Sequence, residues 1–134
     1  MTDLLYVDSS ALVKLIRDEP ESPALRASVG RGTRIVSSRL AEVEIVRASR
    51  LAPSSAETAL RADEVLSGCG LVSIDGGVLA RARELVSPRL RTLDAIHLAT
   101  ALELRVRHLV TYDHRLIEAA SEAGLRVLHP GLAA

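Results

Sequence analysis

Four acidic residues lie in four separate segments, each where a carboxylate could do chemistry. They are Asp8 in "YVDSSALVKL", Glu44 in "SSRLAEVEIVRASRL", Asp94 in "RTLDAIHLATALEL" and Asp113 in "LVTYD". Carboxylates brought together without a cation repel one another, and their pKa values rise. Mg²⁺ and Mn²⁺ prefer such oxygen ligands, and a cation held there can activate water and stabilise charge on a phosphodiester under attack. The pattern therefore indicates a divalent-metal site, provided that the fold brings the four acids together.

Two of these acids, Asp8 and Asp113, directly follow apolar runs and could instead cap the helices that come next. Asp is a favoured N-cap residue, and both positions precede helix-like segments. Ser9 and Ser10 are good N-cap residues as well, so three capping residues in a row exceed what one helix needs. We expect the serines to serve the helix, which leaves Asp8 available for a metal.

Asp94 has a similar alternative role at the start of its helix. Thr92 is the expected N-cap, and Asp94 in the first turn could simply complement the helix dipole. However, Leu98 and Ala101 lie four and seven residues later and place Asp94 on a face that packs. His97 is on the same helix, and we expect it to be a hydrogen-bonded core residue rather than a ligand or a general base.

The helix "SSRLAEVEIVRASRL" offers two acids, and at most one of them can face a given site. Residues two apart on a helix point to roughly opposite sides. Glu44 lies four residues after Leu40, at the edge of the apolar stripe, whereas Glu42 is turned toward solvent near Arg39. An acid near a buried face needs a cationic partner, so Glu44 is the candidate and Glu42 an expected surface charge.

The remaining polar residues have simpler interpretations. Asp75 precedes two glycines in "SIDGGVLA" and is expected to form a turn and cap. Cys69 is expected to be a small structural residue at the entrance of a strand, and His114 to be exposed. Zinc is disfavoured because no His or Cys spacing supports it.

Short apolar runs alternate with longer helical segments along the whole chain. The runs are typical of buried strands, whereas the segments between them have helical spacing and are bounded by Pro and Gly. The expected strands are 4–7, 34–37, 70–74, 108–112 and 125–129, and the expected helices are 9–17, 21–29, 38–51, 54–67, 76–86, 92–105 and 114–123. This alternation predicts an α/β fold in which helices cover both faces of a parallel sheet. Asp8 and Asp113 would then meet at the carboxyl edge of that sheet.

The composition is that of one globular domain. The chain has 134 residues, of which 48% are hydrophobic, so we expect a single domain over residues 1–134. No apolar run approaches the length of a membrane span, and the first residues lack the basic region of a signal peptide. The one cysteine cannot form an internal disulfide. A cytoplasmic protein without membrane attachment is expected.

The charge balance gives no simple argument for nucleic-acid binding. The 17 basic and 17 acidic residues cancel, and Lys14 is the one lysine among them. Arginine binds phosphate well, but genomic base composition would also explain the preference for arginine. Aromatic residues make up 1% of the chain, which disfavours a base-stacking surface.

Together, the four acidic segments resemble the PIN-domain ribonucleases, and most closely the VapC-type toxins of bacterial type II toxin–antitoxin pairs. The resemblance covers residues 3–129, keeps the acids in the family's order and is most specific in "RTLDAIHLATA". It implies a three-layer α/β/α fold with a central parallel sheet of four to five strands. It also implies that Asp8, Glu44, Asp94 and Asp113 are the catalytic acids that bind Mg²⁺ or Mn²⁺. The family's glutamate comes six residues after the residue that opens its helix. Counting from Ser38 selects Glu44, whereas counting from Ser37 would not.

The function that the resemblance implies is metal-dependent endonucleolytic cleavage of tRNA, rRNA or mRNA, which inhibits translation and growth. A homodimer and a cognate VapB-type antitoxin are the implied partners. Arginines beside the acidic segments could hold RNA phosphates, or they could be ordinary surface residues: Arg39, Arg47, Arg89 and Arg91.

The sequence disfavours two other functions. A receiver-like domain would need an adjacent acid pair after the first strand and a lysine after a late strand, and a dehalogenase-like phosphatase would need Asp-x-Asp. Neither pattern is present, since Asp8 is followed by two serines. A non-catalytic α/β binding or signalling module with incidental helix caps is the alternative function.

Overall fold

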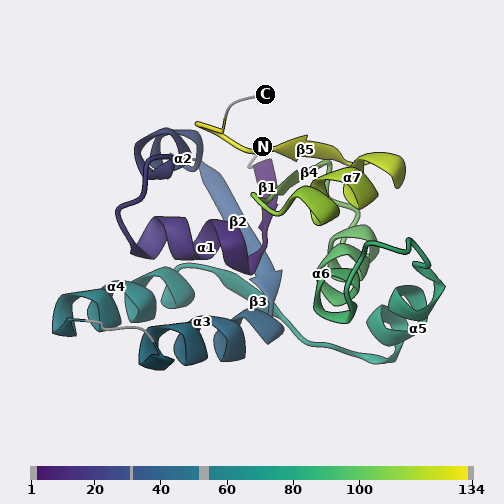
Figure 1. Cartoon of the computed structure of the whole chain (residues 1–134), viewed down its shortest axis with the longest axis horizontal. Helices are drawn as coiled ribbons and strands as arrows, with labels where there is room; N and C mark the ends of the chain where they lie inside the picture. The colour runs from purple at the N-terminus through teal and green to yellow at the C-terminus, as the bar shows by residue number, and fades with distance from the viewer. Residues whose placement is uncertain (1–2, 31, 52–54, 133–134) are drawn as a thin grey trace.

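The computed structural model describes residues 3–30, 32–51 and 55–132, in which five strands alternate with seven helices (Figure 1). The strands are β1 (Asp3–Val7), β2 (Thr33–Ser38), β3 (Gly70–Val72), β4 (His108–Val110) and β5 (Arg126–Leu128). The helices are α1 (Ser9–Ile16), α2 (Ser22–Ser28), α3 (Leu40–Leu51), α4 (Ala56–Ser67), α5 (Gly76–Glu84), α6 (Thr92–Glu103) and α7 (His114–Glu122). Every expected element is present. Residue 54, the expected start of one helix, lies outside the described residues.

The five strands form one parallel sheet in the order β3-β2-β1-β4-β5. β1 is central, with Leu5 aligned with Ile35 of β2 on one side and with His108 of β4 on the other. From β1 the chain first builds the sheet outward through β2 and β3, and then returns to add β4 and β5 on the opposite side. Such a reversal leaves a crevice beyond the carboxyl ends of β1 and β4, where open α/β sheets bind ligands.

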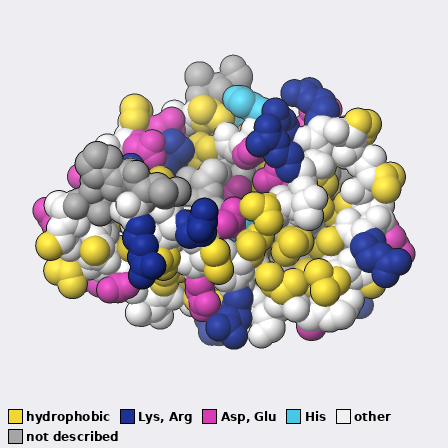
Figure 2. Space-filling view, turned by 60° about the horizontal axis from the view of Figure 1, so that its bottom comes forward, with side chains coloured by type: hydrophobic (Ala, Val, Ile, Leu, Met, Phe, Trp, Pro, Cys, Tyr) yellow, Lys and Arg dark blue, Asp and Glu magenta, His cyan; other side chains and the backbone are white. Residues whose placement is uncertain are grey.

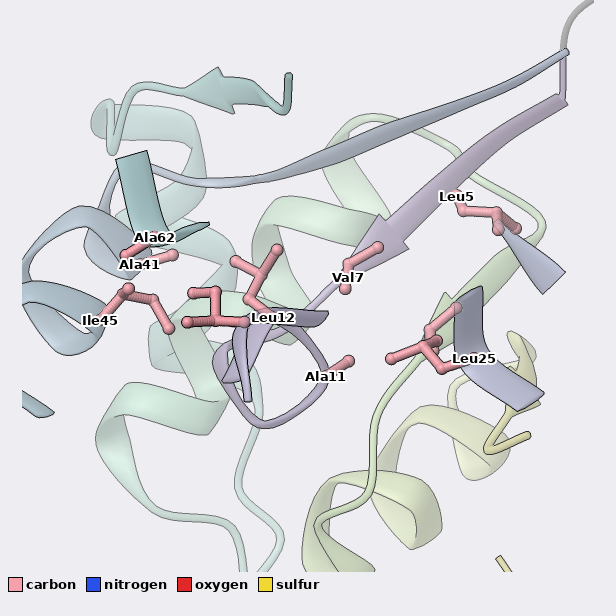
Figure 3. Packing of buried hydrophobic residues seen from close by; sticks show 10 residues of the cluster. Leu5, Val7, Ala11, Leu12, Leu25, Ala41, Ile45 and Ala62 are labelled. Carbon is pink, nitrogen blue, oxygen red and sulfur yellow. The ribbon is translucent and has the colours of Figure 1, made fainter. Parts of the chain in front are cut away.

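The alternation of side chains along β1 divides the core into two layers. Leu5 and Val7 join a buried cluster with α1 to α4, whereas Tyr6 joins a second cluster with α6 and α7. The two groups of helices lie on opposite sides of the sheet (Figure 1). In the first cluster, Leu12 of α1 lies between Val7 and Ile45 of α3 (Figure 3). The three-layer α/β/α fold with a five-stranded parallel sheet is therefore confirmed.

The start of α3 differs from the expectation that a helix covers 38–51. Ser38 is fully buried and belongs to β2, and its Oγ accepts a hydrogen bond from the backbone N–H of Leu40 at 3.0 Å. The backbone N–H of Arg39 donates to the carbonyl of Val72 at 2.9 Å. The sheet therefore holds the chain up to this point, and α3 begins two residues later than expected.

The helices are short in comparison with a bilayer. α3, α4 and α6 have 12 residues each, so each rises about 18 Å. Within the described residues, none of the helices is long and apolar enough to cross a membrane.

Replacing Leu12 by alanine is expected to lower the free energy of unfolding by about 3 kcal/mol, because it opens a cavity in the first cluster. Leu12 is 0% exposed, whereas Leu60 of α4 is 62% exposed. Leu60→Ala is therefore the matched control, with an expected change within about 0.5 kcal/mol. Urea denaturation measures both, and equal effects of the two substitutions would contradict the assignment of this core.

Candidate active site

Asp8 lies at the carboxyl end of the central strand and is held by three elements. Its backbone N–H donates to the carbonyl of Val110 at the end of β4 at 3.2 Å. Its Oδ1 accepts hydrogen bonds from Ser10 Oγ at 2.7 Å and from the backbone N–H of Ala11 at 3.1 Å. Its Oδ2 accepts a hydrogen bond from Thr111 Oγ1 at 2.6 Å. The carboxylate is thus fixed between β1, β4 and α1.

The expectation that Ser9 and Ser10 cap α1 is wrong, because Asp8 itself is the N-cap. The two serines are used elsewhere. Ser9 donates to Glu44. Ser10 donates to Asp8 and accepts a hydrogen bond from the backbone N–H of Tyr112 at 3.0 Å. Sequence alone missed this because all three residues are suitable caps, and tertiary contacts decide among them.

The environment of Asp8 penalises its charge. The side chain is buried, with the residue only 4% exposed, and burial raises the pKa of its carboxyl above the ordinary value. The hydrogen bonds from Thr111, Ser10 and Ala11, together with the proximity of His97, offset part of this effect.

Glu44 of α3 reaches the same edge of the sheet, in a different electrostatic setting. Its Oε1 accepts a hydrogen bond from Ser9 and lies 2.8 Å from Nε2 of His97 on α6. Burial alone would raise the pKa of Glu44, but these contacts with His97 and Ser9 outweigh it and lower the pKa. Glu42 instead lies at the surface, where Arg39 donates to it at 3.4 Å. This arrangement agrees with the helix-face argument that selects Glu44 over Glu42.

His97 is a buried, hydrogen-bonded core residue, as expected, with only 2% of its surface exposed. Its Nδ1 lies 2.7 Å from the hydroxyl oxygen of Tyr6, which is completely buried in the central strand. Its Nε2 contacts Glu44 and lies 3.1 Å from Ser9 Oγ. His97 therefore also contacts the candidate site, and sequence reasoning missed Tyr6 and Ser9 as its partners. Tyr6 is 91 residues away in sequence, so no local pattern could have revealed the pair.

The negative charges of other acids affect the pKa of Asp94. Burial raises the pKa of Asp94, and the negative charges of Asp113 and Glu44 raise it further, whereas His97 opposes them. Asp94 is in the first turn of α6, as expected, but the N-cap of this helix is Arg91 rather than Thr92, and its side chain makes no capping hydrogen bond. The fourth acid, Asp113, caps α7: its Oδ1 accepts hydrogen bonds from the backbone N–H groups of Arg115 and Leu116 at 2.8 and 3.2 Å.

The four acids have the chemistry of a hard-cation site, but their side chains do not enclose an ion. Within residues 3–30, 32–51 and 55–132, no three Asp, Glu, His or Cys side chains lie close enough together to hold a metal. Several of the carboxylate oxygens are engaged by protein donors, as described above. The mutual repulsion that raises the pKa of Asp94 is nevertheless what a bound cation would relieve. The chemistry of the donor set therefore suits a divalent metal, although among the described residues the side chains do not surround one.

The carboxyl edge carries both signs of charge. Figure 2 turns this edge forward and shows acidic side chains near its middle, with basic side chains to either side of them.

Three residues outside the candidate site have the roles expected from the sequence. Asp75 caps α5 by accepting a hydrogen bond from the backbone N–H of Val78 at 2.9 Å, and His114 is exposed. Cys69 is buried just before β3, and burial raises the pKa of its thiol to about 11, which suits a structural role.

A family model described as the PIN domain matches residues 5–122. Two curated relatives from Mycobacterium tuberculosis (strain ATCC 25618 / H37Rv) are similar over nearly their whole length. Ribonuclease VapC46 is 45% identical over 128 residues, covering 94% of this chain and 97% of its own. Ribonuclease VapC35 is 42% identical over 136 residues, covering 97% of this chain and 99% of its own.

Two solved structures share the fold at lower sequence identity. A toxin–antitoxin complex from Klebsiella pneumoniae matches with a TM-score of 0.71 and 22% identity, over 94% of this chain and 97% of that one. Mycobacterium tuberculosis VapC20, a toxin that cleaves the sarcin–ricin loop, matches with a TM-score of 0.72 and 16% identity, over 94% and 99%.

Replacing Asp8 by asparagine is expected to remove one source of pH dependence from the free energy of unfolding, measured in the presence of a chelator. In the unfolded chain the carboxyl of an aspartate has a pKa of about 3.9. In the folded protein the pKa of Asp8 is higher. Between the two values the folded state binds more protons, so the stability of the wild type falls as the pH rises through this window. Asparagine carries no charge and avoids this loss. The stability of Asp8→Asn relative to the wild type should therefore fall as the pH falls toward the pKa of unfolded aspartate.

Asp75→Asn is the matched control, because it alters an exposed N-cap that accepts the same kind of backbone hydrogen bond. Its expected effect is within about 0.5 kcal/mol, since Asp and Asn cap helices about equally well. Urea denaturation across this pH range measures both variants. A difference in stability between the Asp8 variant and the wild type that does not change with pH would contradict the assigned cost of burying this carboxylate.

Proposed function

This chain belongs to the PIN-domain family, and we propose that it is a divalent-metal-dependent endoribonuclease that acts as the toxin of a toxin–antitoxin pair. Relatives named Ribonuclease VapC, 36–45% identical over nearly the full chain, support the activity. The observation that carries the proposal is the geometry of the carboxyl edge, where the buried carboxylate of Asp8 follows the central strand and Glu44 accepts a hydrogen bond from the next residue, Ser9. Such a group of acids at the switch point of the sheet suits hydrolysis of phosphodiesters with a bound cation.

In this proposal Asp8, Glu44, Asp94 and Asp113 are the catalytic acids and would hold Mg²⁺ or Mn²⁺. When bound, the cation would lower the pKa of water and neutralise charge on the phosphodiester. Hydrogen bonds within the chain restrict how the ligands can move. Thr111 donates to Asp8 Oδ2, so rotation of this carboxylate would break a buried bond of 2.6 Å.

The basic residues beside the site suit an RNA substrate despite the zero net charge. Arg39 and Arg89 are paired with carboxylates of Glu42 and Glu118 at 3.4 and 3.2 Å. Arg47 and Arg91 are exposed, and within the described part of the chain no carboxylate pairs with either of them. Unpaired guanidinium groups near an acidic site could bind the phosphates that flank the cleaved bond. We therefore propose Arg47 and Arg91, ahead of Arg39 and Arg89, as contacts to RNA.

The proposed partners are a VapB-type antitoxin and a second copy of the chain. Solved chains with this fold occur in toxin–antitoxin complexes, which supports the antitoxin. We also propose a single PIN domain for residues 1–134, which the family match over residues 5–122 supports, and a cytoplasmic location. The alternative, a non-catalytic binding module, predicts no cleavage and is separated from the nuclease by the following experiments.

The purified protein is expected to cleave fluorescent RNA in Mg²⁺ or Mn²⁺ and to lose this activity in a chelator. Glu44→Gln should lower cleavage on the order of 100-fold or more, because it removes a charged ligand from the site. Glu42→Gln is the matched control on the same helix: it changes a surface carboxylate paired with Arg39 and should leave cleavage unchanged. Initial rates over a range of metal concentrations measure both.

Two results would contradict the proposal. Absence of metal-dependent cleavage by the wild type would favour the non-catalytic module. Equal losses in the Glu42 and Glu44 variants would show that Glu44 has no special place in the reaction.

In bacteria, inducible expression of the wild type is expected to arrest growth and to produce new RNA 5′ ends at defined positions. Asp94→Asn should abolish both effects, because this residue shares the field of the other acids. Co-expression of an antitoxin from the neighbouring reading frame should restore growth. Equal growth arrest by the Asp94 variant, produced at the same level, would show that toxicity does not depend on this site.

A further inference from the structure

We propose that Tyr6 and His97 are positioning residues that hold Glu44 in the orientation it needs to bind metal. The three side chains come from the central strand, from α6 and from α3, and they form a continuous hydrogen-bonded chain. The inference rests on the proposed function, because it treats Glu44 as a metal ligand.

Burial makes this chain of contacts rigid. Tyr6 is 0% and His97 2% exposed, and their rings meet edge to face with centroids 5.9 Å apart and planes at 72°. Water therefore has little access to the contact between the Tyr6 hydroxyl and Nδ1 of His97, which is 2.7 Å long. A buried polar contact of this kind allows few alternative orientations of the imidazole ring.

Counting protons along the chain of contacts assigns a direction to each bond. A tyrosine hydroxyl is protonated at neutral pH and can donate to Nδ1, which then acts as an acceptor. When the imidazole is neutral, its proton is then on Nε2, which lies 2.8 Å from Glu44 Oε1 and donates to it; when the imidazole is protonated, Nε2–H makes the same bond. Ser9 donates to the same oxygen. Oε1 thus receives two donors, and Oε2, which no protein donor among the described residues contacts, is left for a cation.

The geometry disfavours a different role, in which Ser9 is a nucleophile activated by His97. In a Ser–His–acid triad the acid orients the histidine through the ring nitrogen that faces away from the serine. Here that nitrogen, Nδ1, faces Tyr6, whereas Glu44 lies with Ser9 on the Nε2 side. Both Ser9 and His97 therefore act on Glu44.

The bond between His97 and Glu44 also joins the two layers of helices. α3 contributes to the first buried cluster, and α6 contributes to the second, on the opposite face of the sheet. Glu44 would otherwise extend from its own helix toward the carboxyl edge with Ser9 as its one described protein donor. His97 thus fixes Glu44 relative to Asp94, which is on the same helix as the histidine.

The test compares substitutions that keep or remove individual donors. His97→Leu fills the space without a donor, whereas His97→Gln can return an N–H near the position of Nε2. Tyr6→Phe keeps the ring and removes the hydroxyl. Tyr112→Phe is the matched control, since it removes the other tyrosine hydroxyl, which donates to the carbonyl of Pro130 at 2.8 Å and does not contact His97.

Calorimetric titration with Mn²⁺ in the absence of RNA is the first measurement. His97→Leu is expected to weaken Mn²⁺ binding about 10- to 100-fold, as is usual when a residue that orients a ligand is lost. His97→Gln should recover most of the affinity, and Tyr6→Phe should give an intermediate loss. Tyr112→Phe should bind like the wild type. In RNA cleavage at fixed metal, the same order should appear in kcat with little change in KM.

The second measurement is the tautomer of His97, from long-range ¹H–¹⁵N correlation spectra of the metal-free protein. At a pH where the imidazole is neutral, the wild type is expected to show a protonated Nε2 and an unprotonated Nδ1. Tyr6→Phe should replace this single tautomer by a mixture, whereas Tyr112→Phe should preserve it. This measurement remains available even if His97→Leu fails to fold.

The outcomes separate this inference from the proposed function. Wild-type Mn²⁺ binding and cleavage together with unchanged affinity in His97→Leu, or a proton on Nδ1 of the wild type, would overturn the positioning role alone. Equal losses in Tyr6→Phe and Tyr112→Phe would assign the effect to general stability and would also overturn it. A wild type that neither binds Mn²⁺ nor cleaves RNA would refute the proposed function, and the inference with it.

Discussion

The buried carboxylate of Asp8 is the constraint on which the rest of the structure depends. It joins the end of the central strand to Thr111 beyond β4 and to the first turn of α1. Removing this charge from water is unfavourable, and the hydrogen bonds that the carboxylate accepts offset only part of the cost, because the pKa remains raised. The fold thus places an energetically unfavourable charge at the point where the order of its strands reverses, which is typical of a functional site.

Two of the other acids differ in how the protein treats their charge. His97 and Ser9 lower the pKa of Glu44 and so favour its ionised form, whereas burial, followed by the charges of Asp113 and Glu44, raises the pKa of Asp94 and disfavours its ionised form. A group of acids with opposite pKa shifts cannot all be satisfied by protein donors alone. A divalent cation, if bound as proposed, would favour ionisation of every member.

The sequence was sufficient to predict the alternation of strands and helices, and with it that Asp8 directly follows β1 and that Asp113 directly precedes α7. Apolar runs such as 4–7 and 108–112, bounded by caps and breakers, have the same meaning in most α/β folds. The predictions were wrong where several neighbouring residues were equally suitable as helix N-caps. Asp8 rather than Ser9 or Ser10 caps α1, because the serines find tertiary partners. Long-range partners also determine the role of His97, since Glu44 is 53 residues away.

The double character of His97 follows from the position of its helix. A histidine in the core needs partners for both ring nitrogens, and Tyr6 and Glu44 provide them. Apolar side chains in place of both His97 and Tyr6 would avoid this requirement, so stability alone does not explain an imidazole at this place. The imidazole adds a rigid hydrogen-bond donor on α6, and this donor orients the carboxylate of Glu44 on α3. The same bonds therefore satisfy the core and shape the site, and the distinction between a core histidine and a functional one does not apply here.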